Sequence, residues 1–367
     1  MCAFVASWLN MQRLILLAFF AGSMFAADPL RLGIVGLEHG HVTGFLRRGL
    51  NRPDVKIVGI AEPDTEVAAR YVKQFQLDPA IMYTSLEQML DKAKPQAVAT
   101  MTNTFDHKRV VEVCASRGVH VMMEKPLAVS NEHARAMAEA ARKGKIQVLV
   151  NYETTWYANN SILWNEIKEK QSLGEIRKAV IRDGHEGPKE IGVQPEFFAW
   201  LTDPVKNGAG ALYDFGCYGA NIMTWLMDNQ RPLTVTAVTQ QIKPAIYKNV
   251  DDDATIIVTY PRAQAVIQAS WNWPYSRKDL DIYGQTGYIQ TIAGKAARVK
   301  IGKGEEETRN ASPAATPYDE PLSYLSAVVR GEIKPSGLSS LENNIIVTEI
   351  LDAARRSAQS GRTIKLQ

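Results

Sequence analysis

Hydrophobic and polar residues alternate with two different periods in the first part of the chain. Short apolar runs of strand length are separated by segments in which apolar residues recur at helical spacing. The predicted buried strands are 31–37, 55–61, 97–101, 119–123 and 147–151, and the predicted helices are 66–75, 85–92, 108–117 and 131–143. Strands that alternate with helices predict a doubly wound parallel sheet. This unit ends near residue 150.

The pattern changes in the second part of the chain. A helical segment, 158–171, is followed by strand-like segments with few helices between the later ones. These segments are 176–182, 233–242, 254–260, 265–271, 280–283, 288–292 and 297–301, and late helices are predicted over 321–330 and 341–357. Strands without helical crossovers favour antiparallel pairing. The predicted fold class is therefore α/β, with a doubly wound parallel domain over 28–150 and an α+β domain with a large, open, mainly antiparallel sheet over 151–367. Because an open sheet needs covering, we expect a homo-oligomer.

The first 27 residues have a composition of their own. Arg13 precedes an apolar run, 14–21, and small residues follow it up to Ala27. A basic start, a short apolar core and small residues are typical of a secretory signal, and the core is short for a membrane span. We therefore expect residues 1–27 to be a signal peptide that is cleaved near Ala26, and the mature protein to be exported to a periplasm. An uncleaved anchor is the alternative.

The overall composition is that of an ordinary globular protein. Of the 367 residues, 46% are hydrophobic and 22% are charged, and the net charge of +3 is spread without long runs. Nothing in this pattern favours a nucleic-acid-binding groove. Cys114 and Cys217, which remain after loss of the signal, are too few for a disulfide framework. His39, His41 and His185 lack metal-type spacing, so no metal is expected.

The loop after the first strand is a candidate for dinucleotide binding. A Rossmann-like fold uses glycines here, because they let the backbone approach a pyrophosphate at a helix start. The predicted cofactor contacts in this loop are Gly33, Gly36, Glu38, His39, Gly40 and His41. Relative to the usual G-x-G-x-x-G pattern, Glu38 takes the place of the second glycine and His41 that of the third. A carboxylate near a pyrophosphate is repulsive unless it points away.

Polar residues also follow the next two long strands. Glu62 ends the strand 55–61, where a carboxylate can accept hydrogen bonds from a ribose diol and repels a 2′-phosphate. This favours NAD over NADP, and an acidic turn residue before a helix is the plainer alternative. Thr102, Asn103 and His107 follow the strand 97–101 and are predicted cofactor contacts as well.

Two further motifs carry the candidate chemistry. Glu124-Lys125-Pro126 follows the strand 119–123, so a lysine is held at the carboxyl end of a strand, where open α/β sheets bind ligands. Asp214 and Tyr218 follow a glycine-rich run, and a helix that begins near Asp214 would place them on one face. A carboxylate and a phenol that face a lysine form a proton-transfer set. The alternatives are a solvated lysine in an ordinary turn and a structural Tyr218–Asp214 hydrogen bond.

These motifs resemble those of the Gfo/Idh/MocA oxidoreductases, which include glucose–fructose oxidoreductase and inositol dehydrogenase. The resemblance rests on Glu124-Lys125-Pro126, on Asp214-x-Gly216-x-Tyr218 and on the strand-rich second half. It covers nearly all of the chain after the signal. Many members have histidine at the place of Tyr218, and the glucose–fructose oxidoreductase and dihydrodiol dehydrogenase branches look more similar because they have tyrosine there.

The resemblance implies a role for each of these residues. Lys125 would lie beside the nicotinamide and polarise the reacting oxygen, with Glu124 as a neighbouring cofactor contact. Tyr218 would be the general acid/base, with its pKa lowered by Lys125. Asp214 would orient the pair or touch a substrate hydroxyl. The departures from the family pattern are Glu38, His41, Asn103 and the segment 152–154.

Aromatic side chains near the expected cleft indicate the class of substrate. Sugars stack their C–H faces on aromatic rings, so aromatics beside a lysine–tyrosine pair favour a sugar, glycoside or polyol, although any single ring is more often core. The predicted substrate contacts are Lys125, Tyr152, Trp156, His185, Trp200, Asp214 and Tyr218.

Export would set a condition on the cofactor. Free NAD is scarce outside the cytoplasm, so we expect a tightly held cofactor that is reduced and reoxidised within one cycle. Such a cycle fits sugar oxidation coupled to reduction of a second sugar, or redox-neutral cleavage or epimerisation through a keto-sugar. A non-catalytic sugar or nucleotide sensor on the same fold is the other alternative.

Overall fold

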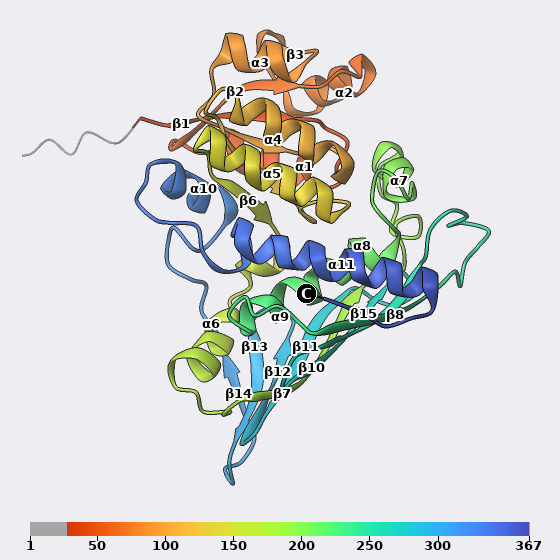
Figure 1. Cartoon of the computed structure of the whole chain (residues 1–367). Helices are drawn as coiled ribbons and strands as arrows, with labels where there is room; N and C mark the ends of the chain where they lie inside the picture. Colours follow the sequence, from red (N-terminus) through yellow and green to blue (C-terminus); the bar gives the residue numbers. More distant parts are fainter. Residues whose placement is uncertain (1–27, 367) are drawn as a thin grey trace, which may run out of the picture.

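The computed structural model describes residues 28–366, which form two sheets (Figure 1). The first sheet has six parallel strands in the order β3-β2-β1-β4-β5-β6. Its strands are β1 Leu30–Val35, β2 Val55–Ala61, β3 Met82–Tyr83, β4 Ala97–Thr100, β5 His120–Glu124 and β6 Val148–Asn151. The strand order reverses at β1, which pairs with β2 on one side and β4 on the other. A ligand crevice is expected outside the carboxyl ends of these strands.

Helices cover this sheet, and local polar side chains cap the beginnings of three of them, α2, α3 and α5. The helices are α1 Val42–Leu50, α2 Thr65–Phe75, α3 Leu86–Ala93, α4 His107–Ala115 and α5 Asn131–Gly144. The side chains of Asp64, Ser85 and Ser130 accept hydrogen bonds from backbone N–H groups in the first turns of α2, α3 and α5. Such caps satisfy donors that have no partner within the helix.

The second sheet has nine strands in the order β14-β13-β12-β11-β7-β10-β9-β8-β15. Its strands are β7 Ile176–Gly184, β8 Thr234–Gln240, β9 Asp253–Thr259, β10 Gln264–Ser270, β11 Arg277–Gly284, β12 Gly287–Ile292, β13 Ala296–Ile301, β14 Glu307–Asn310 and β15 Ile364–Lys365. Neighbouring strands pair antiparallel, except that β10 and β7 are parallel. The predicted fold class, a parallel Rossmann-like sheet followed by a mainly antiparallel sheet, is confirmed.

One face of the large sheet is covered by helices of the second half. These are α8 Ala211–Asp214, α9 Gly216–Leu226 and α11 Leu341–Ser360, with α7 Pro195–Leu201 and α10 Pro321–Val329 nearer the first sheet. α9 packs on β7 and β10, whereas α11 packs on β8 and α9. α11 also contacts α5 and β6, and Figure 1 shows it lying between the first sheet and the large sheet.

Several short elements were not predicted. β3, β14 and β15 have two to four residues, and α7 has seven, so none is long enough to show a clear period. The predicted helix 158–171 was wrong in part, because α6 Asn160–Leu163 is followed by a π-helical turn, Trp164–Glu169. Glu166 on this turn is buried and forms ion pairs with Lys170 and Arg309, which hold the turn in place.

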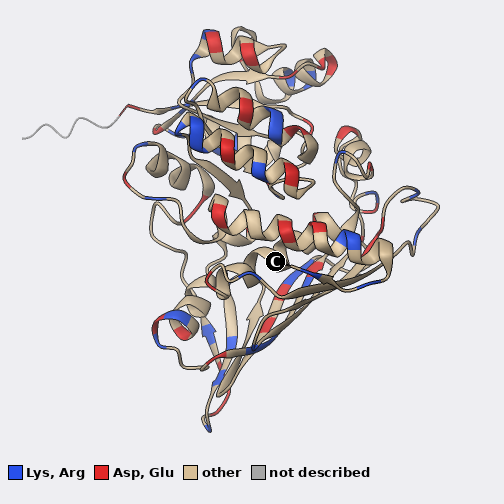
Figure 2. Ribbon diagram, viewed as in Figure 1, with Lys and Arg blue, Asp and Glu red and all other residues tan. Residues whose placement is uncertain are grey.

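Charges of both signs are mixed along the helices of the first sheet and on α11 (Figure 2). Within residues 28–366, no helix is both long and apolar enough to span a membrane. The signal-peptide prediction falls on residues 1–27, which lie outside the described residues. Cys114 and Cys217 are both buried and unbridged.

The packing of α5 on α4 depends on a glycine. A Cβ at Gly144 would lie 2.4 Å from the Ala115 carbonyl oxygen, so Gly144→Ala must push the two helices apart. We expect it to lower the free energy of unfolding by about 1–3 kcal/mol. Gly44→Ala in α1 is the control, because its Cβ would meet nothing closer than Arg48 at 3.9 Å. Urea denaturation of both variants would contradict this packing if Gly144→Ala were as stable as the control.

Candidate active site

A buried ion pair between the two halves of the chain forms the centre of the candidate site. Lys125 follows β5, and its Nζ donates to the carbonyl oxygen of Asp214 at 2.9 Å and to the Asp214 carboxylate. The other carboxylate oxygen accepts from Trp271 Nε1 at 2.9 Å. Lys125 and Asp214 are each only 5% exposed. Residues that are 89 positions apart in the sequence thus fix one another's side chains.

Each member of this pair keeps the other charged. Burial alone lowers the pKa of Lys125, but the Asp214 carboxylate raises it, and the net pKa is above that of an ordinary lysine. Burial alone raises the pKa of Asp214, but Lys125 lowers it, and the net pKa is below its usual range. An ammonium that stays charged in a dry site can stabilise negative charge on a neighbouring oxygen.

Tyr218 lies beside Lys125, but not in the arrangement that the sequence predicted. The helix does not run through Asp214: α8 ends there, Phe215 intervenes, and α9 begins at Gly216. The Asp214 carboxylate therefore faces Lys125 and Trp271 instead of Tyr218. The predicted lowering of the Tyr218 pKa was also wrong, because burial raises it well above the usual value. The Lys125 Nζ lies 5.1 Å from the centroid of the Tyr218 ring.

A second lysine near Tyr218 was missed by the sequence analysis. Lys278 on β11 has its Nζ 5.1 Å from the centroid of the Tyr218 ring and 2.5 Å from Glu153 Oε2. Asp183 on β7 is buried nearby, and burial raises its pKa well above the usual value. Both residues lie in phase with the buried positions of their strands, such as Ile181 and Leu280. A charged residue at an inward-facing position of a strand was the signal that could have found Lys278.

The loops after β1 and β4 lie against one another at the predicted cofactor crevice. Gly36 has a φ of +76°, and a Cβ there would lie 2.8 Å from Thr102 Cγ2. Glu38 accepts hydrogen bonds from the backbone N–H and side-chain Nδ2 of Asn103, at 2.8 and 3.0 Å. Its carboxylate is therefore tied across to the β4 loop, and burial raises its pKa. Gly33 packs within β1 against Met89 and has no part in the loop surface.

Glu62 stands at the carboxyl end of β2, as predicted. Its two oxygens accept from the backbone N–H groups of Leu37, at 2.7 Å, and Asp64, at 2.9 Å. The side chain is thereby fixed beside the loop after β1, and burial raises its pKa. Carboxylate oxygens have further lone pairs, so these bonds leave room to accept from a hydroxyl group.

Three of the predicted cofactor residues form a cluster that the sequence spacing did not reveal. His41 Nδ1 lies 3.0 Å from Glu124 Oε2, and His39 Nδ1 accepts from the His41 backbone N–H at 3.1 Å. Potential metal-ligating atoms of His39, His41 and Glu124 lie within 4.8 Å of one another. In the present arrangement, hydrogen bonds within the cluster use Nδ1 of each histidine. The expectation of no metal was based on spacing and did not bring Glu124 into the group.

Helix α7 of the second half covers the loop after β1. Its Phe197 ring packs on His39, and a Cβ at Gly40 would lie 3.1 Å from that ring. Trp200 Nε1 donates to the Glu38 carbonyl oxygen at 3.3 Å. Trp200 was predicted to contact the substrate, but the structure places it on the cofactor loop. Figure 1 shows α7 reaching towards the carboxyl edge of the first sheet.

The other predicted substrate residues divide into two groups. Tyr152 is fully buried, and its hydroxyl donates to Asn344 Oδ1 at 2.9 Å, so the prediction that it contacts substrate was wrong. Its ring instead supports that of Tyr218 edge-on, at 5.5 Å. Trp156 lines an open cleft, and its Nε1 donates to Asn151 at 2.9 Å. His185 packs edge-on against Phe215, the residue that precedes the Tyr218 helix.

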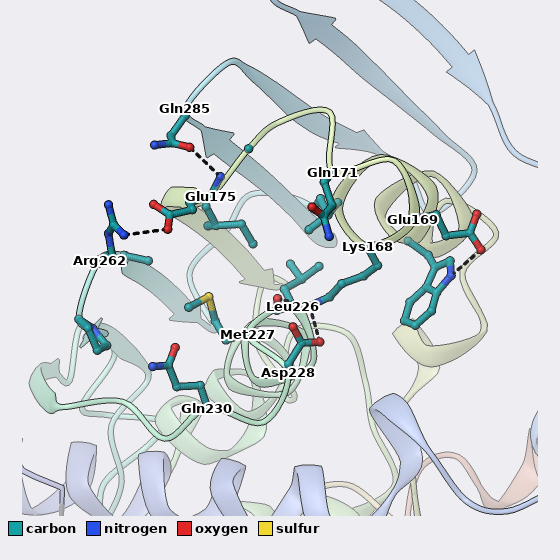
Figure 3. Close-up of a pocket in the computed structure, with 16 residues that line it drawn as sticks. Lys168, Glu169, Gln171, Glu175, Leu226, Met227, Asp228, Gln230, Arg262 and Gln285 are labelled. Carbon is teal, nitrogen blue, oxygen red and sulfur yellow. Dashed lines mark hydrogen bonds and ion pairs between the residues drawn. The ribbon is translucent and has the colours of Figure 1, made fainter.

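An open cleft lies beside Glu124. It has a volume of about 460 Å³ and is lined by residues that include His41, Glu124, Asn151, Glu153, Trp156 and Tyr157. A cavity of about 780 Å³ in the second half is larger, but it lies between the π-helical turn and the start of β7 (Figure 3). Its charged side chains are paired with one another, as in Lys168–Asp228 and Arg262–Glu175. Position and chemistry, not size, favour the cleft beside Glu124.

Comparisons with known proteins agree with the fold and the motifs. The family model for the oxidoreductase family with an NAD-binding Rossmann fold (Gfo/Idh/MocA) matches residues 30–152, and the model for the Gfo/Idh/MocA C-terminal domain matches residues 164–290. The chain belongs to the Gfo/Idh/MocA oxidoreductase family. It is therefore an NAD-binding oxidoreductase by family.

Individual relatives in this family are distant. Trans-1,2-dihydrobenzene-1,2-diol dehydrogenase from Xenopus laevis is 23% identical over 82% of this chain and 89% of its own length. The crystal structure of aldose–aldose oxidoreductase from Caulobacter crescentus with glycerol has a TM-score of 0.77 and 22% identity, over 92% of this chain and 100% of that one. An inositol dehydrogenase homolog from Azotobacter vinelandii with NAD+ has a TM-score of 0.79 and 18% identity, over 93% and 98%. At such identities, the solved structures establish the fold alone.

The residues at the crevice fit a bound dinucleotide. Buried polar atoms there have no hydrogen-bond partner among the described residues, namely Nε2 of His39 and His107 and the Thr104 hydroxyl. Gly36 lets the backbone of the two loops approach closely, and Glu62 stands where a ribose would lie. The Glu38 carboxylate is held by Asn103, which restrains it from turning towards a pyrophosphate.

His107 gives the fold a dependence on pH. Its Nδ1 donates to the Leu127 carbonyl at 3.2 Å, and burial lowers its pKa from 6.5 to about 4. The unfolded chain binds a proton below pH 6.5, whereas the folded chain does so only near pH 4, so stability falls as the pH drops through this window. The fall is about 3 kcal/mol from this residue. In His107→Asn, which can still donate to Leu127, that part of the loss should disappear in denaturation curves between pH 7 and 4. Equal pH slopes in the two proteins would contradict the assignment.

Proposed function

We propose that this chain is an exported, NAD-dependent oxidoreductase that acts on a hydroxyl group of a sugar, glycoside or polyol. The observation that carries the proposal is the buried Lys125 ammonium at the carboxyl end of β5, held by Asp214 beside Tyr218. Family membership supports the redox class and the nucleotide. The signal-like residues 1–27 support export.

Lys125 acts on the substrate oxygen. During oxidation, negative charge develops on the reacting hydroxyl oxygen, and an adjacent ammonium stabilises it. Asp214 positions that ammonium, and Trp271 in turn fixes Asp214 through its second carboxylate oxygen. Bound NAD supplies the acceptor for the hydride. All the charge stabilisation on the protein side comes from groups already in place before substrate arrives.

Tyr218 moves the proton. Burial raises the pKa of the Tyr218 phenol and so keeps it protonated, which a proton donor needs in the direction of carbonyl reduction. In the direction of oxidation it must first release that proton. The ammonium group of Lys125, 5.1 Å from the ring centroid, stabilises the phenolate that results.

The cofactor would be NAD rather than NADP. Glu62 sits at the end of β2, where its carboxylate can accept from the ribose diol and would repel a 2′-phosphate. The loop from Gly36 to His41 and the beginning of α1 would face the pyrophosphate. Helix α7, which packs on Gly40 and His39, would help to retain a bound nucleotide, and this supports a cofactor that stays on the protein through a redox-neutral cycle.

The residues that line the cleft, and the ligands bound in similar solved structures, support a sugar or polyol as the substrate. Trp156 and Tyr157 line the cleft beside Glu124, and aromatic rings stack well on the C–H faces of sugars. Among the similar structures, an inositol dehydrogenase homolog binds myo-inositol, and an aldose–aldose oxidoreductase binds glycerol. A polyhydroxylated substrate therefore suits this chain.

The catalytic role of Lys125 can be separated experimentally from its contribution to folding stability. Lys125→Met leaves the Asp214 carboxylate buried without a partner and should cost about 3–5 kcal/mol. The double variant Lys125→Met/Asp214→Asn removes both charges, so it should fold more stably than the single variant. We expect both to lose at least 100-fold in kcat for NAD-dependent oxidation of a substrate found by screening sugars and polyols. NADH binding, followed by fluorescence, should persist in the double variant. Activity within tenfold of the wild type in the folded double variant would refute the proposed chemistry.

If the cofactor stays bound to the protein throughout the cycle, it should be found in the purified protein. The mature chain, purified without added nucleotide, should release close to one NAD(H) per chain on acid denaturation, identified by absorbance and mass. Little NADP(H) is expected, because of Glu62. If the purified protein carries no nucleotide and binds added NAD only weakly, the proposal of a tightly bound cofactor is wrong. Ordinary dehydrogenase activity with added NAD would then remain to be measured.

A further inference from the structure

Lys278 has an environment that neither stability nor the proposed chemistry requires. It lies at an inward-facing position of β11, and its ammonium has one hydrogen-bond partner among the described residues, Glu153 Oε2 at 2.5 Å. The Lys278 side chain is 20% exposed, whereas that of Glu153 is 48% exposed. Glu153 comes from the short 3₁₀ helix η3 Glu153–Trp156, at the edge of the open cleft. A lysine deep in the site is thus neutralised by a carboxylate from the rim.

The Glu153 carboxylate is bound from two sides. Its second oxygen accepts from the Tyr157 hydroxyl at 2.7 Å. One Glu153 oxygen thus accepts a hydrogen bond from an ammonium group and the other accepts one from a hydroxyl group. A protein binds the carboxylate of a ligand with contacts of the same kind. Since Glu153 is half exposed and lies on a single short turn, its side chain can swing into the cleft.

Behind this pair lies a small cavity with polar walls. Its volume is about 30 Å³, enough for about one water molecule, and its lining includes Tyr157, Asn160, Asp183, Tyr218 and Lys278. Asp183 Oδ2 is buried and has no hydrogen-bond partner among the described residues. Tyr157 lines both this cavity and the open cleft. The Tyr157 hydroxyl and the Lys278 ammonium both bind the Glu153 carboxylate, so a ligand from the cleft can bind this pair only if Glu153 moves away.

Asp183 forms no hydrogen bond or ion pair with Lys278 among the described residues, because the Lys278 ammonium is paired with Glu153. Burial raises the pKa of Asp183 well above its usual value, which favours its protonated form. When Glu153 swings out, the Lys278 ammonium therefore loses its paired carboxylate in a mostly buried site, which is unfavourable. The carboxylate of a bound ligand would neutralise the charge of the Lys278 ammonium, whereas an uncharged hydroxyl group would not.

We propose that the substrate of this site carries a carboxylate, and that Lys278 and Tyr157 bind it in the place that Glu153 occupies. The inference rests on the proposed function and narrows its substrate to sugar acids. Lys125 and Lys278 each lie 5.1 Å from the centroid of the same Tyr218 ring, so their ammonium groups are at most twice that distance apart. A hydroxyl at Lys125 and a carboxylate at Lys278 can belong to one monosaccharide acid.

Binding to matched pairs of sugars tests this inference. The probes are neutral sugars and their acids, namely glucose with gluconate and glucuronate, and galactose with galactonate and galacturonate, titrated calorimetrically into the protein saturated with NAD. We expect the best acid to bind at least tenfold more tightly than its neutral partner. Lys278→Met should weaken acid binding by about 10- to 100-fold and leave neutral sugars nearly unchanged.

Two further variants separate recognition from structure. Glu153→Gln removes the competing carboxylate, so it should tighten acid binding several-fold, an effect that a purely structural pair would not give. Lys278→Arg should retain most of the preference for acids. Lys178→Met is the control, because Lys178 is an exposed β7 lysine that contacts Gln264 on the surface. It should change neither kind of binding.

The outcomes also distinguish this inference from the proposed function. The carboxylate inference is overturned if the protein oxidises neutral sugars with no preference for acids. It is also overturned if Lys278→Met weakens the binding of neutral and acidic sugars equally. Neither result contradicts the proposed oxidoreductase activity. Acid binding that depends on Lys278, without NAD-dependent turnover of any acid, supports the site and counts against the proposed reaction. Absence of binding across all pairs overturns the inference and removes the sugar class as well.

Discussion

The buried ion pair between Lys125 and Asp214 is the interaction on which the site depends. Two charges withdrawn from water are stable only if their remaining hydrogen-bonding capacity is met. Here the ammonium also binds the Asp214 carbonyl, and the second carboxylate oxygen binds Trp271. Lys125 belongs to the first sheet, whereas Asp214 and Trp271 belong to the second half. The same contacts that keep the lysine charged therefore fix how the parallel sheet meets the substrate side.

The loop after β1 lacks two glycines of the usual pattern, and contacts with other segments compensate for both replacements. Glu38 and His41 stand where the usual pattern has glycine, and each has a partner from another segment at the same edge of the sheet. Asn103 holds the Glu38 carboxylate, and Glu124 holds the His41 ring. Repulsion between Glu38 and a pyrophosphate depends on where the carboxylate points, so the restraint by Asn103 makes the departure compatible with nucleotide binding. Helix α7 then covers the loop, which links cofactor retention to the second half of the chain.

Tyr218 is placed by apolar contacts and flanked by charges. Tyr152 and Phe215 pack against its ring, and the ammonium groups of Lys125 and Lys278 approach it from β5 and β11. Burial makes the phenol a weaker acid, because it raises the pKa of Tyr218 well above the usual value. The nearby Lys125 ammonium acts in the opposite direction, since a positive charge favours the phenolate. The proton affinity of Tyr218 in the working site is set by the balance between these effects.

The sequence by itself determined the elements and the motifs. Apolar runs and helical spacing gave both domains and most of their strands, since these periods follow from local geometry. Lys125 and Glu62 were placed at strand ends for the same reason. Which side chains meet was decided by tertiary structure: Asp214 turned to Lys125 because the helix breaks at Phe215, and the Tyr152 hydroxyl turned to Asn344 in the core. The pKa of Tyr218 and the partners of Lys278, His41 and Glu38 depend on burial and on contacts between distant segments, and no local period encodes these.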